Sequence, residues 1–196
     1  MAYAIALLSA VVVATSSWAG GVPRSSVLMK DSGNRFLEAK RYADAIDCYF
    51  QALELSPAYS EAHYNLGVAF LRGYNAFPLA LYHFEKYLAL EPEAEDAESV
   101  GALVTTLRER SRPPGARPGE VLGVVAGRLV VAGGAWVRPG DRLQVAHKGE
   151  PPCAHLLAAY VYPDRVLSQR IRDPAVLEQV REGMLAVNTA ERLTAR

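Results

Sequence analysis

The feature that most constrains the fold is a segment of the chain that occurs twice. Gly33 recurs as Gly67 after 34 residues, and Pro57 recurs as Pro92 after 35 residues. A period of this length is the signature of a repeat architecture, in which each copy is one supersecondary unit that stacks on its neighbour. The positions that recur in register are Met29, Ser32, Gly33, Phe36, Ala45, Tyr49 and Pro57 in the first copy and His63, Leu66, Gly67, Phe70, Ala80, Phe84 and Pro92 in the second.

The two copies resemble the tetratricopeptide repeat, whose pattern is W-x2-L-G-x2-Y, then A-x3-F, then P. The resemblance covers residues 26–110 and implies two helix-turn-helix repeats followed by a capping helix over about residues 93–110. The recurring glycines then lie on the first helix of each pair, where the second helix must come close. The recurring prolines end the second helices, because proline has no N–H and clashes with the preceding turn.

The second copy departs from the first in two places. It has one extra residue between its two helices, which predicts a longer turn. In that turn we expect Gly73 to take the left-handed conformation that ends a helix, and Pro78 suits the first turn of the next helix. Tyr87 stands where the first copy has Ala52, so this side chain either loosens the helix pair or faces a different neighbour.

The residues after the repeats change period. Prolines and glycines predict a linker over residues 111–119, and residues 120–196 predict a small β-rich domain with helical ends. We therefore assign the chain to the α+β class, with all-α repeats followed by this domain. The expected elements are hairpins that pair 121–125 with 128–132 and 135–137 with 142–146, strands over 156–162 and 165–171, a helix after Asp173-Pro174, and a short helix from Asn188. The alternative for 154–162 is a short helix.

Part of the β-rich domain has a short resemblance to FecR-type periplasmic domains. The resemblance rests on the run Gly127-Arg128-Leu129 and on the turn Gly140-Asp141-Arg142-Leu143. It implies a signalling regulator of the cell envelope. The alternative is an unrelated small β domain that is built from common hairpin residues.

The N-terminus has the form of an export signal. Residues 2–14 are almost wholly apolar, and Ser17-Trp18-Ala19 has the small-x-small pattern of a cleavage site. We therefore assign residues 1–19 to a signal peptide and expect the mature protein in the periplasm or outside the cell. No Lys or Arg precedes the apolar run. The alternatives are an uncleaved anchor, for which the run is short compared with the about 20 residues that span a bilayer, and a buried helix.

Composition and charge limit the classes of partner. Hydrophobic residues make up 51% of the chain and charged residues 21%, as in a globular protein. The formal net charge is zero, but residues 24–110 carry a net charge of −4 and residues 111–196 a net charge of +4. The two halves can therefore attract each other. Neither half is basic enough to indicate nucleic-acid binding.

The expected partner-binding face is made by the first helices of the pairs. In this family the first helices line the inside of a curved stack. Tyr64 is the expected anchor, because interface energy concentrates in aromatic residues; the alternative is that Tyr64 packs against a neighbouring helix. The candidate partner-binding residues are Lys30, Asn34, Leu37, Tyr64, Asn65 and Val68.

Three of these residues also match a carboxylate clamp of one class of these repeats. Lys30, Asn34 and Asn65 occupy the places from which that class binds the C-terminal carboxylate of a peptide. The clamp also needs basic residues on the third first helix, where this chain has Asp96 and Val100. The alternative is a groove of general polarity.

An enzyme would need a site in the C-terminal domain. His147, Cys153 and His155 are close enough in sequence to suggest zinc ligands, but no fourth ligand is evident. Cys48 is expected to be a buried apolar residue, although in an exported protein Cys48 and Cys153 could form a disulfide. The sequence contains no phosphate-binding loop, nucleophile elbow or His-Glu-x-x-His motif.

These features predict an exported, non-enzymatic interaction module or scaffold that holds a protein or peptide partner in the groove of its repeats. We expect no cofactor, metal, nucleic acid or small-molecule substrate, and no membrane span in the mature chain. The alternatives are an envelope signalling regulator with a FecR-like domain and an enzyme with a zinc or cysteine site in the C-terminal domain.

Cleavage of the signal peptide predicts that the mature chain begins at Gly20, directly after Ala19. N-terminal sequencing of the protein from its natural host measures this. A soluble cytoplasmic species that begins at Met1 or Ala2 would contradict the assignment.

Overall fold

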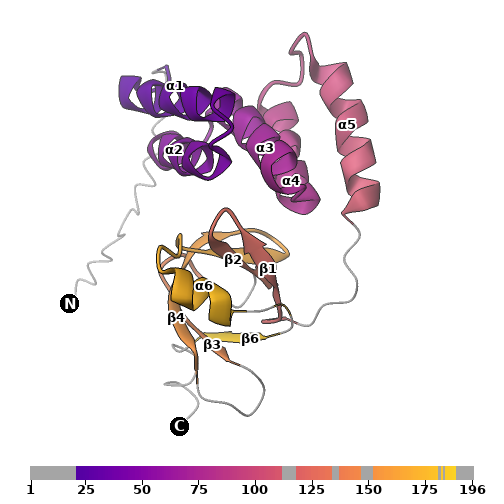
Figure 1. Ribbon diagram of the computed structural model, residues 1–196. Coiled ribbons are helices and arrows are strands. Elements are labelled where there is room, and N and C mark those ends of the chain that lie inside the picture. The colour runs from indigo at the N-terminus through magenta and orange to yellow at the C-terminus, as the bar shows by residue number, and fades with distance from the viewer. Residues whose placement is uncertain are drawn as a thin grey trace, which may run out of the picture.

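The computed structural model describes residues 21–111, 118–133, 137–146, 152–180, 182 and 184–188. Its N-terminal part is a series of helices that pack in consecutive pairs (Figure 1). α1 packs on α2 and α3 on α4, and α5 packs on α4 as a capping helix. This arrangement confirms the two predicted repeats. The bounds are α1 Arg24–Glu38, α2 Tyr42–Leu55, α3 Ser60–Tyr74, α4 Phe77–Leu90 and α5 Ala97–Arg110.

Two predicted segments fall outside this description. The signal peptide over residues 1–19 and the linker residues 112–117 are not among the described residues. Within the part of the chain that is described, no helix combines the length and the apolar character that crossing a membrane requires.

Close helix contacts form at the two recurring glycines. Gly33 faces the ring of Tyr49, and a Cβ atom on Gly33 would lie 2.5 Å from Tyr49 Cε1. Gly67 faces the ring of Phe84, where the corresponding distance is 3.1 Å. Both rings are buried, with exposed fractions of 0% for Tyr49 and 1% for Phe84. Each ring therefore occupies the space that a larger side chain would need.

The turn of the second pair differs from the prediction. Asn75, not Gly73, takes the left-handed conformation, with a φ of 48° after the end of α3. Gly73 lies inside α3 and packs closely on Tyr42, since a Cβ on Gly73 would lie 2.6 Å from Tyr42 Cβ. Asparagine adopts the left-handed region more readily than most residues that carry a Cβ. Pro78 lies in the first turn of α4, as predicted.

Tyr87 does not simply loosen the second pair, because it faces a different neighbour. Its side chain is 9% exposed, and its hydroxyl donates to Asp96 Oδ1 over 2.5 Å. Asp96 directly precedes α5. The larger residue at this position therefore connects α4 to the capping helix.

The C-terminal part is a six-stranded antiparallel sheet with the strand order β1-β2-β5-β4-β3-β6. Its edge strands meet, since Val121 N–H donates to Met184 O and Ala186 N–H donates to Gly119 O, each over 2.7 Å. The sheet therefore curls around its own apolar core. The bounds are β1 Val121–Val125, β2 Arg128–Ala132, β3 Arg142–Ala146, β4 Ala154–Val161, β5 Arg165–Ser168, α6 Pro174–Gln179 and β6 Leu185–Asn188.

Most elements predicted for this part are confirmed. The first hairpin forms, strands β4 and β5 flank Pro163-Asp164, and α6 follows Asp173, whose Oδ1 accepts from Ala175 N–H over 2.9 Å. Residues 135 and 136 of the second predicted hairpin lie outside the described residues, but the predicted pairing with β3 is wrong, because both edges of β3 are hydrogen-bonded by β4 and β6. Asn188 is the last residue of β6, and the short helix predicted to begin there falls on residues that are not described. Residues after Asn188 lie outside the described part.

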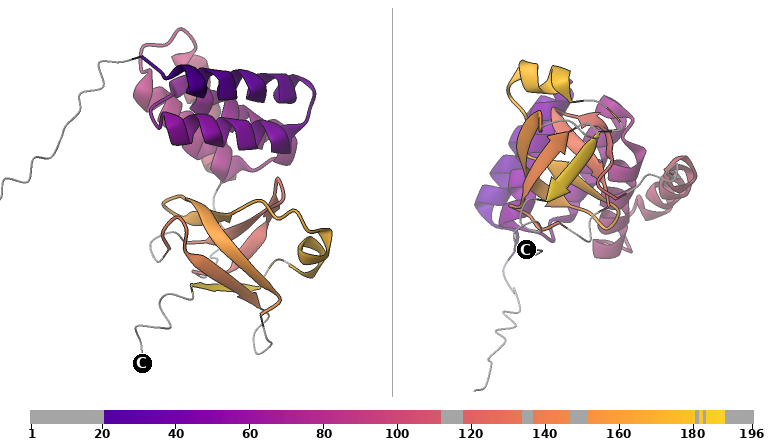
Figure 2. Two further views of the ribbon diagram at one scale, coloured as in Figure 1. Left: turned by 90° about the vertical axis from the view of Figure 1, so that its left-hand side faces the viewer. Right: turned by 90° about the horizontal axis from the view of Figure 1, so that it is seen from below.

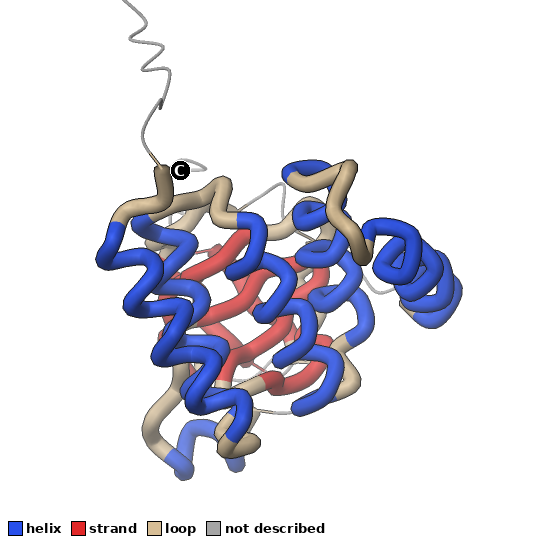
Figure 3. Tube along the Cα trace, turned by 90° about the horizontal axis from the view of Figure 1, so that it is seen from above, coloured by secondary structure: helices blue, strands red, loops and turns tan. Residues whose placement is uncertain are grey.

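The sheet lies against the second helices of the pairs. Figures 1 and 2 show α1 above α2 with the sheet below, and Figure 3 shows the strands beneath the helices. The ring of Tyr160 on β4 stacks on Phe50 of α2, with ring centroids 3.5 Å apart. Val130 and Leu167 of the sheet belong to the same apolar cluster as the helices. The face made by α2 and α4 is therefore covered by the sheet.

Ion pairs join the acidic helical half to the basic C-terminal half. Arg128 of β2 lies 2.6 Å from Asp47, and Arg170 lies 3.0 Å from Asp44 and 2.7 Å from Asp47. The hydrogen bond from Arg170 holds the pKa of Asp44 below its usual value, against the smaller opposing effect of burial. The opposite net charges of the two halves thus meet at this junction. The domain limits at 26–110 and 120–196 stay predictions.

The glycine contacts predict a ranking of three identical substitutions. Gly67→Val should destabilise the protein by about 1–3 kcal/mol, as overpacking commonly does, and Gly33→Val should cost more because its ring contact is tighter. The matched control is Gly101→Val on α5, where a Cβ would meet nothing within 4 Å. Its effect should stay within about 0.5 kcal/mol. Urea unfolding measures all three, and equal stability of the Gly33 and Gly101 variants would refute the close contact.

Candidate functional site

The six candidate residues lie on the two helices that are farther from the sheet. Lys30, Asn34 and Leu37 are on α1, and Tyr64, Asn65 and Val68 are on α3. All six are partly buried. Asn65 Nδ2 donates to Asn34 Oδ1 over 3.0 Å, and Lys30 Nζ lies 3.0 Å from Glu61 at the start of α3. These contacts bring residues of the two helices together, and we call the resulting strip the α1–α3 groove.

Asn34 has a structural role within the groove. Its Oδ1 accepts from the Tyr49 hydroxyl over 2.8 Å as well as from Asn65. Tyr49 is fully buried, and burial is the main cause that raises the pKa of its hydroxyl. Because a buried hydroxyl without a partner is costly, Asn34 stabilises the ring that packs on Gly33.

The charge of Lys30 is already compensated inside the protein. Its ammonium lies 3.0 Å from both Asp31 and Glu61, and its side chain is 14% exposed. Burial lowers the pKa of Lys30, but the hydrogen bonds with these two carboxylates outweigh burial and raise it above the usual value. A carboxylate ligand would have to compete with two acids for this lysine.

Tyr64 packs against the second helix of its own pair. Its ring contacts Phe84 and Tyr87 of α4 edge-on, with centroid distances of 5.6 Å and 5.2 Å. The hydrogen bond to Asp96, followed by burial, raises the pKa of Tyr87 to about 12. Tyr64 is thus a partly exposed ring that packs on the rings of Phe84 and Tyr87.

The third position of the carboxylate clamp does not supply positive charge. Asp96 accepts a hydrogen bond from the Tyr87 hydroxyl, and Val100 is only 4% exposed within the apolar core. The arrangement of Lys30, Asn34 and Asn65 therefore lacks the basic residues with which that class of repeats completes the clamp.

Among the described residues, the zinc candidates do not form a cluster. His147 lies outside the described residues, and Cys153 Sγ donates to Val145 O over 3.4 Å. Among the described residues no group of three or more His, Cys, Asp or Glu side chains is arranged to hold a metal ion. Cys48 and Cys153 are both free thiols, and both are only partly buried.

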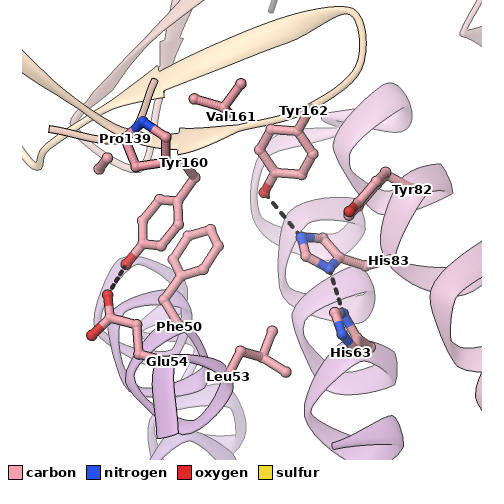
Figure 4. A pocket seen from close by; sticks show the side chains of 11 residues that line it. Phe50, Leu53, Glu54, His63, Tyr82, His83, Pro139, Tyr160, Val161 and Tyr162 are labelled. Atoms are coloured by element: carbon pink, nitrogen blue, oxygen red, sulfur yellow. Dashed lines mark hydrogen bonds between the residues drawn. The ribbon is translucent and has the colours of Figure 1, made fainter. Parts of the chain in front are cut away.

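The sequence analysis missed a chain of hydrogen bonds between the helices and the sheet. His63 Nε2 lies 3.0 Å from Pro57 O, and His63 Nδ1 lies 3.0 Å from His83 Nδ1. His83 Nε2 in turn lies 3.0 Å from the Tyr162 hydroxyl of the sheet (Figure 4). His63 occupies the first position of the repeat pattern, but no local signal pairs it with residues so distant in sequence.

These groups border a pocket of about 230 Å³ between the helices and the sheet. Figure 4 shows Phe50 and Tyr160 on one side of the pocket and Tyr162, Tyr82 and His83 on the other. The pocket is mainly aromatic, and its carboxylate, Glu54, accepts from the Tyr160 hydroxyl over 3.1 Å.

Residues 33–72 match the family model described as TPR repeat. The matched residues lie within the two recurring copies, and the match agrees with the resemblance that those positions carry. No curated protein matches the sequence.

Several solved tetratricopeptide domains are similar to this chain. The first TPR of Spaghetti (RPAP3), bound to the HSP90 peptide SRMEEVD, is 22% identical with a TM-score of 0.41, over 46% of this chain and 73% of that chain. The Sgt2 TPR domain from Aspergillus fumigatus is 26% identical with a TM-score of 0.41, over 45% and 58%. The Arabidopsis OM64 TPR domain is 19% identical with a TM-score of 0.24, over 44% and 96%.

The two groove asparagines should differ in their effect on stability. Asn34→Ala leaves the buried Tyr49 hydroxyl without its acceptor and should cost about 1–3 kcal/mol. Asn65→Ala removes only a donor to Asn34, whose Oδ1 keeps the bond from Tyr49, so it should cost less. Urea unfolding of both variants measures the difference, and equal losses would show that the Tyr49 bond is not the cause.

Proposed function

We propose that this chain is a non-enzymatic interaction module that binds a protein or peptide partner along the α1–α3 groove. The observation that carries the proposal is the position of the sheet. Phe50 of α2 and His83 of α4 face the sheet through Tyr160 and Tyr162. The second-helix face is therefore occupied by the chain's own residues, and the first helices offer the other broad face of the repeats.

The groove chemistry favours a partner with apolar and basic side chains. Leu37, Tyr64 and Val68 provide apolar surface next to the core. The charge of Lys30 is compensated by Asp31 and Glu61, so the strip around it carries more negative than positive charge. Electrostatic complementarity would select a cationic segment over a free carboxylate.

We further propose that the module acts outside the cytoplasm, in the periplasm or another extracytoplasmic compartment. The apolar run over residues 2–14 and the cleavage pattern at Ser17-Trp18-Ala19 support this location. An extended peptide of an envelope or secreted protein would then be the partner.

The test is crosslinked capture of partners by the full mature chain and by matched variants. Tyr64→Ala removes the aromatic anchor, for which truncation commonly costs about 2 kcal/mol, or about thirtyfold in affinity. Glu61→Lys reverses a charge on a side chain that is 63% exposed, and it should weaken capture of a basic partner. Circular dichroism and thermal melting check that both variants remain folded.

The controls repeat the same chemistry on the C-terminal part. Leu157→Ala truncates an apolar side chain on β4 that is 40% exposed, and Glu178→Lys reverses an exposed charge on α6. Both should capture partners as the wild type does. If the folded groove variants retain every partner and Leu157→Ala loses them, the binding site lies on the sheet and not in the groove.

A further inference from the structure

The hydrogen-bond chain from Pro57 to Tyr162 has one consistent set of protons when both imidazoles are neutral. A carbonyl oxygen only accepts, so His63 must carry its proton on Nε2 and leave Nδ1 bare. His83 must then carry its proton on Nδ1 to donate to His63, which leaves its Nε2 bare. The Tyr162 hydroxyl donates to that nitrogen. In this state each of the three hydrogen bonds between Pro57 O and the Tyr162 hydroxyl has one donor and one acceptor.

An additional proton disrupts this pairing. One proton on His63 Nδ1 forces His83 to donate from Nε2 to the Tyr162 oxygen, and the Tyr162 hydroxyl hydrogen then loses its acceptor. A second proton would place two N–H groups opposite each other across the 3.0 Å gap between the Nδ1 atoms. Neither imidazole can therefore become charged at low cost while these hydrogen bonds are intact.

Burial also disfavours a positive charge on either imidazole, and Lys86 has the same effect at His63. The exposed fractions are 7% for His63, 3% for His83 and 5% for Tyr162. Burial is the main cause that lowers the pKa of both histidines. At His63 the hydrogen bond to Pro57 O opposes burial and Lys86 adds to it, and at His83 the neighbouring His63 adds to burial. Other ionisable side chains surround the two histidines and Tyr162. They are Lys86 and Tyr82 on α4, Glu54 on α2, Arg128 on β2, Tyr160 on β4 and Arg165 on β5.

We propose that His63, His83 and Tyr162 form an acid-sensitive latch, which holds the sheet on α4 at neutral pH and releases it as the pH falls. Histidines that are kept neutral in the closed state stabilise it above the ordinary histidine pKa of about 6.5 and lose this effect below it. The adjoining pocket gives water a route to the opened groups.

The α2 side of the junction should stay closed under the same conditions. It is held by the Phe50–Tyr160 stack and by the ion pairs of Arg128 and Arg170 with Asp47. Arg170 also pairs with Asp44, and its hydrogen bond holds the pKa of Asp44 below its usual value, so mild acid leaves that pair charged. Mild acid would therefore move the sheet away from α4 first, and expose Tyr82, His83 and Tyr162.

The first measurement identifies the protons directly. Long-range ¹H–¹⁵N spectra of the full mature chain at pH 7.5 should show His63 protonated on Nε2 and His83 protonated on Nδ1. A His83 that carries its proton on Nε2 would overturn the proposal, because Tyr162 could then not donate to it.

The second measurement follows opening by hydrogen exchange of the amides in residues 80–84 and 159–162, corrected for intrinsic rates, between pH 7.5 and pH 5. The opening constant should rise by about tenfold per pH unit for each proton taken up, so by up to about a hundredfold per unit for two histidines. His63→Gln offers the same carbonyl and N–H contacts without titrating. It should remain closed at pH 7.5 and lose about half of the logarithmic pH slope.

Two tyrosine variants separate the latch from general packing. Tyr162→Phe removes the hydroxyl that donates to His83 and should raise the opening constant at pH 7.5 by about tenfold. Tyr160→Phe removes a hydroxyl bonded to exposed Glu54 and should leave the pH slope unchanged. A wild-type opening constant that does not change with pH, or a His63→Gln slope equal to that of the wild type, refutes the latch.

Discussion

The contact between the sheet and the α2–α4 face decides what the repeats can do. One helix pair cannot bury its own apolar face, and the described N-terminal part of the chain has two pairs and the capping helix α5. Phe50 packs on Phe70 on its helical side and on Tyr160 on its sheet side, and it is only 3% exposed. The sheet thus takes the place of further repeats as a covering layer, and it does so on the face opposite the groove.

The same contact places a charged group in the interior. Arg128 is almost fully buried, and its guanidinium donates to Asp47 and to Ser168 O while lying 5.5 Å from the centroid of the Phe50 ring. Removing Asp47 would be costly, because the charge of Arg128 would stay buried without its partner. Arg128 Nε lacks a hydrogen-bond partner, so the site is not fully satisfied. The junction therefore needs Arg128 and its partners in one particular arrangement, in addition to apolar contact.

The sequence predicts local structure well and the junction poorly. The recurrence of Gly33 and Gly67 predicts that a second helix comes close to each glycine, but only the structure shows that the rings of Tyr49 and Phe84 meet them. The prediction of a left-handed Gly73 was wrong, because the helix continues to Tyr74 and Asn75 takes that conformation, while Gly73 gives room to Tyr42 of another helix. His83 and Tyr162 are 79 residues apart, and no periodicity relates them. Strand β6 was missed because its pairing with β3 is equally non-local.

The groove shows how one repeat pattern can support different recognition. Lys30, Asn34 and Asn65 match the positions of a carboxylate clamp, but here Lys30 pairs with two acids and Asn34 accepts from Tyr49. Groups that are committed to internal partners must break those contacts before they bind a ligand, which reduces the affinity they can provide. The side chains of the groove that carry no such commitment are apolar, Leu37 and Val68, together with the ring of Tyr64. Recognition by this groove therefore depends on apolar and aromatic contact, with charge acting mainly to exclude anionic partners.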